Sequence, residues 1–194
     1  MKNGFKAIMA VLVAIGMLGF AGAGNAQEVN GPVPWVSNIN GKDNSLMVKQ
    51  TDTDWFEGMV NTPLGEGDMV FQDKGGRSEI FIDKGTYLRL DSDSAVQFDR
   101  LTDNEIRVVL TKGRVIASNA RGTPVLIDVP GQTVIVNRGA KARIDVSEFG
   151  DTKVASRRGR VTVDSPQGQF RVDPGHSMTA NEYGGNNRLN RESG

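Results

Sequence analysis

The residue types that support catalysis are scarce in this sequence. His176 is the only histidine and cysteine is absent, so a Ser-His-Asp relay would have to use His176, and the chain can form no disulfide, zinc-thiolate site or cysteine nucleophile. No G-x-S-x-G motif, which marks an exposed nucleophilic serine, occurs near His176. We therefore interpret His176, which directly follows Pro174-Gly175, as a turn or strand-edge residue, and we predict neither a catalytic residue nor a histidine-based metal site.

Two acidic segments have the spacing that opens a calcium-binding loop. Asp91-Ser92-Asp93-Ser94 and Asp52-Thr53-Asp54 each place carboxylates at positions i and i+2. Counted from Asp91, however, the sixth position is Val96 where the loop needs glycine, and the twelfth is Thr102 where it needs glutamate. An EF-hand is therefore excluded. A polar turn is the interpretation we adopt, and a shallow surface calcium site is the alternative.

Other enzyme signatures are equally weak. Gly65-Glu66-Gly67 lacks the third glycine of a phosphate-binding loop, because Val70 stands at that position, and no helical pattern follows it. Paired carboxylates for glycoside hydrolysis are defined by their separation in space, so a carbohydrate-binding or hydrolytic domain remains a weaker alternative. We predict a protein that is not an enzyme and that uses no cofactor.

The N-terminus has the three-part layout of a secretory signal peptide. Lys2 and Lys6 precede an apolar run over residues 7–23, which is followed by the small-residue stretch Gly24-Asn25-Ala26. We expect cleavage between Ala26 and Gln27, with an uncleaved N-terminal anchor as the alternative. The mature chain is then periplasmic or otherwise extracytoplasmic, with no transmembrane segment after cleavage and no access to nucleic acid.

The rest of the chain shows the period-two alternation of β-strands. From Arg77 onward, apolar residues occupy one phase and polar or charged residues the other, which buries one face of each strand and exposes the other. The apolar positions include Ile80, Ile82, Leu88, Leu90, Val96, Phe98, Ile106, Val108, Leu110, Val125, Ile127, Val129, Val134, Val136, Ala142, Ile144, Val146, Val161 and Val163. No comparable stretch has a helical period, so the sequence predicts an all-β fold.

Tight turns recur between these segments, each with a glycine that can take a positive φ. They are Asp83-Lys84-Gly85, Thr111-Lys112-Gly113, Asn137-Arg138-Gly139, Arg157-Arg158-Gly159 and Asp173-Pro174-Gly175. Their irregular spacing favours a twisted two-sheet sandwich or a solenoid-like β-roll over a strict β-helix. We expect a lead-in over 27–34, one β domain over 35–180 and a disordered tail over 181–194.

Charge is distributed unevenly along the chain. Residues 52–105 carry 13 acidic and 5 basic side chains, whereas residues 106–160 carry 4 acidic and 11 basic ones. This pattern predicts either ordinary solvated strand faces or a basic contact surface for an anionic partner. The residues of the predicted contact surface are Lys141, Arg143, Lys153, Arg157, Arg158 and Arg160.

Several short motifs follow one another in a characteristic order. They are Asn61–Asp68, Arg77–Ile80 and Tyr87–Leu90, then Val125–Val129, Ala142–Val146 and Val154–Val163, with Trp35 and Trp55 at the early aromatic positions. This order, over roughly Trp35 to Met178, resembles the FecR-domain family of periplasmic proteins. The resemblance implies a domain outside the inner membrane that relays the state of an outer-membrane transporter to an anti-sigma segment.

One feature departs from the regulators of that family. Only six residues precede the apolar segment, too few for a cytoplasmic anti-sigma domain. We therefore expect a non-enzymatic binding or scaffolding module whose partner is an envelope protein or an anionic cell-wall or outer-membrane polymer. The alternative is a sensory component of a sigma/anti-sigma system whose cytoplasmic partner is a separate chain.

Overall fold

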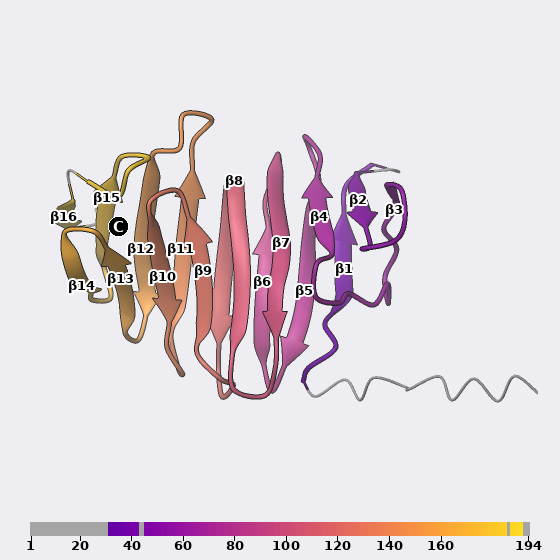
Figure 1. The fold of residues 1–194 in the computed structure, drawn as a ribbon, viewed down its shortest axis with the longest axis horizontal. Helices are drawn as coiled ribbons and strands as arrows, with labels where there is room; N and C mark the ends of the chain where they lie inside the picture. Colours follow the sequence, from indigo (N-terminus) through magenta and orange to yellow (C-terminus); the bar gives the residue numbers. More distant parts are fainter. Residues whose placement is uncertain (1–30, 43–44, 186, 192–194) are drawn as a thin grey trace, which may run out of the picture.

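The fold is built from strands alone (Figure 1). The computed structural model describes residues 31–42, 45–185 and 187–191, and the predicted cleavage site at Ala26 and Gln27 lies outside these ranges. Within them, no helix is long and apolar enough to cross a membrane. The strands are β1 (Trp35–Asn40), β2 (Leu46–Lys49), β3 (Phe56–Glu57), β4 (Met69–Gln72), β5 (Arg77–Asp83), β6 (Thr86–Leu90), β7 (Ser94–Leu101), β8 (Ile106–Asn119), β9 (Val125–Val129), β10 (Gln132–Val136), β11 (Lys141–Val146), β12 (Thr152–Arg158), β13 (Val161–Ser165), β14 (Gly168–Val172), β15 (His176–Ala180) and β16 (Arg188–Arg191).

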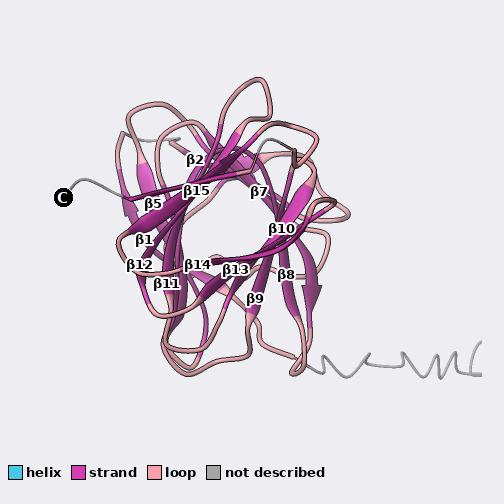
Figure 2. Cartoon of the chain, turned by 90° about the vertical axis from the view of Figure 1, so that its left-hand side faces the viewer, coloured by secondary structure: helices cyan, strands magenta, loops and turns pink. Residues whose placement is uncertain are grey.

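The strands form two curved sheets that wrap around one core, as the view along the roll shows (Figure 2). Sheet A has the order β1-β5-β6-β8-β11-β12-β15-β16, and sheet B has the order β3-β2-β4-β7-β8-β9-β10-β13-β14. Neighbouring strands are antiparallel, except that β8 and β9 are parallel. The predicted all-β class is confirmed, and the architecture is an open roll.

Strand β8 belongs to both sheets and joins them. Its first part, up to Lys112, pairs with β7 in sheet B, and its second part, from Gly113, pairs with β11 in sheet A. Gly113 has a φ of 90°, and a Cβ atom there would lie 2.4 Å from the carbonyl oxygen of Asp93. The sequence Thr111-Lys112-Gly113, predicted to be a turn, is therefore the bend of a continuous strand.

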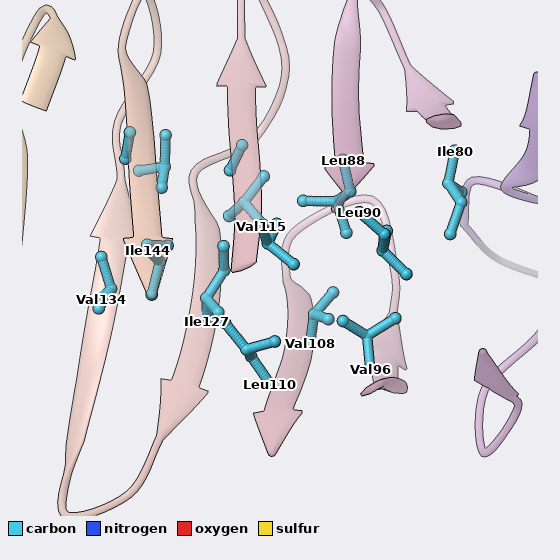
Figure 3. Close-up of a cluster of buried hydrophobic side chains, with 14 of the residues drawn as sticks. Ile80, Leu88, Leu90, Val96, Val108, Leu110, Val115, Ile127, Val134 and Ile144 are labelled. Carbon is cyan, nitrogen blue, oxygen red and sulfur yellow. The ribbon is translucent and has the colours of Figure 1, made fainter. Parts of the chain in front are cut away.

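The core follows the predicted strand phase. Val108, Ile127, Ile144 and Val161 are all at most 1% exposed, and three of them are seen in Figure 3 among the buried side chains of neighbouring strands. Their sequence neighbours point outward: Arg107, Asp128 and Arg143 are half-buried and Arg160 is exposed. β-branched side chains on the inner faces fit this pleated, fully buried surface.

The C-terminal segment differs from the expected disordered tail. Residues 188–191 form β16, which pairs antiparallel with β15, with Leu189 opposite Met178. Upstream, the side chain of Asn181 accepts hydrogen bonds from the backbone N–H groups of Tyr183 and Gly185 and so holds the intervening turn. The polar composition predicted disorder, but β15 would otherwise be a free edge whose backbone groups a polar segment can pair with.

Candidate binding surface

Four turns at one end of the strands of sheet A are stacked on one another. They comprise residues 83–86, 119–122, 137–140 and 157–160, and together we call them the turn row. Backbone N–H groups join them: Ala120 donates to the carbonyl of Gly85 at 3.2 Å, and Gly139 donates to that of Asn119 at 2.7 Å. The fourth turn packs equally closely, because a Cβ atom on Gly159 would lie 2.8 Å from the Cα atom of Ala140.

A buried asparagine fixes the centre of the turn row. Asn119 is fully buried, and its amide group donates hydrogen bonds to the carbonyls of Thr123 at 3.0 Å and Val136 at 3.2 Å. Its side-chain oxygen accepts the N–H of Gly122 at 3.0 Å. One side chain thus satisfies three backbone groups on two segments, at residues 122–123 and at the end of β10, where the chain crosses between sheets.

The six residues of the predicted contact surface do not form one patch. Strands β11 and β12 are neighbours as expected, and Lys141 lies opposite Arg158. Lys141, Arg143 and Arg157 line a groove on the outer face of sheet A, of about 730 Å³. Lys153 lies in a second groove of about 950 Å³, at the other end of the strands. Arg158 and Arg160 belong to the turn row, and Arg158 donates to the carbonyl of Gly139 at 3.2 Å.

Alternating charges cross the outer face of sheet A and offset part of its positive charge. Arg77 Nε lies 2.8 Å from Asp91 Oδ1, and Arg114 Nη1 lies 3.2 Å from Asp91 Oδ2. Arg114 also pairs with Asp145, whose second oxygen lies 2.7 Å from Arg143 Nε. The hydrogen bond from Arg114 to Asp145 is the main cause of the raised pKa of the Arg114 guanidinium. Arg143 is thus held by Asp145 and is not a free cation.

The carboxylates considered for calcium are also engaged by cations. The nearby Lys112 ammonium lies 2.7 Å from Asp93 Oδ1 and lowers the pKa of that carboxyl. Burial opposes ionisation of Asp91, but hydrogen bonds from Arg77, Ser92 and Arg114 outweigh it and leave the pKa lowered. Within the described part of the chain, no three ligand residues come together as a metal site would require. His176 is exposed at the start of β15, as predicted, and its Nδ1 lies 3.3 Å from the carbonyl oxygen of Pro174.

The sequence patterns did not reveal an apolar surface at the N-terminal end of the roll, near β1 and β3. Its members are large apolar side chains that stay 39–69% exposed: Val33, Trp35, Trp55, Met59 and Val60. We call them the N-terminal apolar patch. The segments that carry them are hydrogen-bonded together, since Val36 donates to the carbonyl of Thr62, and Gln50 Nε2 to that of Pro63. The tryptophans were recognised only as family positions, because exposure is not encoded in a local pattern.

Aromatic rings extend this patch along the outer face of sheet A. The rings of Trp35 and Phe81 are 4.3 Å apart at their centroids, and those of Phe81 and Tyr87 are 5.1 Å apart. These residues are direct cross-strand neighbours on β1, β5 and β6. The contacts fix the orientation of Trp35, which reduces the side-chain entropy it would lose on binding a partner.

Comparisons with known proteins agree with this architecture. Two crystal structures of one candidate anti-sigma factor from Parabacteroides distasonis ATCC 8503, at 2.50 and 1.65 Å resolution, each superpose with a TM-score of 0.56 and 19% sequence identity. The matched region covers 64% of this chain and 60% of that one, so this chain spans under two thirds of its length. At this identity the likeness shows a shared fold. No curated protein gives a significant match.

The sequence itself matches a protein-family model. The model is that of the FecR protein, and the match covers residues 68–162, from the residue before β4 into β13. This stretch contains the bent strand β8 and all four turns of the turn row. Residues 68–162 of this chain therefore constitute a FecR-family domain, as the order of the sequence motifs predicted.

Proposed function

We propose that this chain is a non-catalytic, extracytoplasmic binding module that engages a protein partner in signalling of the sigma/anti-sigma kind. The FecR-family domain and the fold shared with an anti-sigma factor support this role. The signal-peptide pattern at the N-terminus supports a site of action outside the cytoplasm. The N-terminal apolar patch is the observation that carries the proposal, because it is a surface suited to a protein partner.

The composition of the patch favours a protein ligand. Five of the eight large apolar residues that are exposed in the described chain belong to it, and they include both tryptophans. Tryptophan and methionine are enriched in the central parts of protein interfaces, where charged residues are depleted. Exposed apolar surface that gathers at one end of a molecule is typical of an interaction site.

The backbone next to the patch is already paired, so the side chains carry the contact. Thr62 and Pro63 run along the outer edge of β1, where Val36 donates its N–H to the carbonyl of Thr62 and its carbonyl accepts the N–H of Asn61. An incoming strand therefore finds no free edge at Trp35 and Val36, the part of β1 next to the patch. Recognition by side chains in pockets of the partner follows from this arrangement, and strand addition does not.

Substitution of the two most accessible patch side chains tests the proposal. Met59→Ser with Val60→Ser removes apolar groups that are 69% and 51% exposed, so the fold should be unaffected. The matched control is Tyr183→Ser with Leu189→Ser, which are 74% and 55% exposed at the other end of the roll. We expect the first variant to lose proteins that co-purify with the wild-type chain from cross-linked envelopes, and the control to retain them.

The identity of the captured proteins separates the two roles. An anti-sigma protein or an outer-membrane transporter supports signalling, whereas only structural envelope proteins would support a scaffold. Equal capture by both variants would show that the N-terminal apolar patch is not the partner surface.

A further inference from the structure

The turn row carries a line of cations that the sequence did not reveal as one surface. Its exposed basic residues are Lys84, Arg121, Arg138, Arg157, Arg158 and Arg160. Lys84, Arg121 and Arg138 were not part of the predicted contact surface, because they lie up to 76 residues from Arg160 in sequence. Only the stacking of the four turns brings them together along one rim of sheet A, where β5 and β12 end in Figure 1.

Acidic side chains offset little of this charge. Asp83 lies 3.7 Å from Lys84 Nζ, and Asp173, in the next turn along, is paired with Arg171. No carboxylate of the described residues lies within ion-pair distance of Arg121, Arg138 or Arg160. Repulsion among exposed cations costs little in water, but three guanidinium groups left without carboxylate partners are available to an anionic ligand.

The line is held rigidly and follows the strand repeat. The turns belong to β6, β8, β11 and β12, which are consecutive in sheet A, so their ends are separated by about 4.8 Å each and the row spans about 14 Å. Backbone hydrogen bonds between turns prevent them from spreading apart to relieve the repulsion. A rigid linear row of guanidinium groups is complementary to a linear polymer with an anionic group on each repeat.

We propose that the turn row binds an acidic polysaccharide, whose carboxylates pair with Arg121, Arg138, Arg158 and Arg160. Guanidinium groups match carboxylates in a bidentate geometry. The turns contain no aromatic ring on which a nucleic-acid base could stack. Ala120 and Ala140 are their only apolar side chains, so they lack the large groups that insert into a lipid surface.

This binding site uses different residues from the proposed protein-binding surface, although its first turn, 83–86, lies between Phe81 and Tyr87, whose rings extend the N-terminal apolar patch. The turn row involves sheet A strands from β6 to β12, whereas the N-terminal apolar patch lies on β1, residues 55–63 and the lead-in. The four arginines proposed to bind the polymer lie in the other three turns, so one proposal can fail without the other.

Binding of polygalacturonate, measured by titration calorimetry at about 0.15 M salt, tests the proposal. The row variant carries Arg121→Glu, Arg138→Glu and Arg160→Glu, and the control variant carries Lys42→Glu, Lys74→Glu and Arg188→Glu. The control cations are exposed, lie at the opposite ends of the strands, and change the net charge equally. We expect the row variant to bind about tenfold more weakly or worse, the control to bind like the wild type, and both to melt near the wild-type temperature.

Three other results would overturn the proposal. Equal weakening in both variants would mean attraction by net charge only, and unchanged binding in the row variant would exclude the turn row. If the wild type binds polygalacturonate no more tightly than uncharged dextran, acidic polysaccharides are excluded as the ligand class. Binding of single-stranded DNA or anionic phospholipid vesicles would not change that conclusion.

Discussion

At the scale of single residues, the roll depends on polar side chains that serve the backbone. Asn119 makes hydrogen bonds to Gly122, Thr123 and Val136 from a fully buried position. No sequence motif singled out this residue. Its role depends on the meeting of chain segments that are up to 17 residues apart, and no local pattern encodes that meeting.

We predict that Asn119→Ala destabilises the fold. The substitution leaves buried carbonyl and N–H groups without partners, which costs about 1–3 kcal/mol in the free energy of unfolding. Asn137→Ala is the matched control, because that amide is less buried and donates to the carbonyl of Arg160 at 3.2 Å. Urea denaturation of both variants measures the difference, and equal losses would contradict the role assigned to Asn119.

A second prediction concerns acid sensitivity at Asp93. The hydrogen bond from Lys112 lowers the pKa of this carboxyl below its ordinary 3.8, so ionised Asp93 stabilises the fold above that value and the contribution is lost as pH falls through the folded-state pKa. Asp93→Asn should therefore cost about 0.2–1 kcal/mol at pH 7 and less at about pH 2, because protonation of Asp93 removes the contribution of the ion pair as the pH falls. Asn is a suitable replacement because it tolerates the positive φ of 56° at this position.

Urea denaturation at both pH values checks this pH dependence. Asp54→Asn, for which the described chain shows no ion pair, should cost little at either pH. If Asp93→Asn lowered the free energy of unfolding by the same amount at both pH values, the ion pair with Lys112 would not be the cause of the loss.

At the scale of elements, the bend of β8 is the critical local feature. Gly113 combines a φ of 90° with close contact to Asp93 and Ser94, so alanine there meets both backbone strain and a steric clash. We predict that Gly113→Ala costs roughly 2 kcal/mol or more. Gly75→Ala isolates the strain, because Gly75 has a φ of 82° but no atom within 4 Å of the added Cβ. A calorimetric melting experiment should show a clearly larger loss for Gly113→Ala than for Gly75→Ala, and equal losses would contradict a clash at the bend.

The elements were largely predictable from sequence, and their contacts were not. Period-two alternation correctly placed Ile127 and Ile144 in the core, because strand phase is a local property. Gly113 was predicted to lie in a turn, but it lies at the bend of a strand. Both features need a residue that can take a positive φ, so the sequence does not distinguish them. The basic contact surface was predicted from residues that are close in sequence. In the structure Lys153 lies in another groove, and Arg121 and Arg138 lie in the turn row.

At the scale of the whole molecule, the roll presents two surfaces of different chemistry. The acidic and basic halves of the sequence partly neutralise each other where β7 pairs with β8, as Asp93 and Lys112 do at 2.7 Å. What remains is the row of cations on the stacked turns and the N-terminal apolar patch. A module with a protein-binding end and a polymer-binding edge suits a position between a cell-wall polymer and a signalling partner.

Site-specific photo-crosslinking in intact cells tests the central claim of a protein partner at the N-terminal apolar patch most directly. A photoreactive residue replaces Met59 in one version and Tyr183 in the other, both of which are highly exposed. The account predicts that the probe at position 59 captures one discrete protein, identified by mass spectrometry, and that the probe at position 183 does not capture it. Capture of the same proteins from both positions, or no capture from position 59, would contradict it.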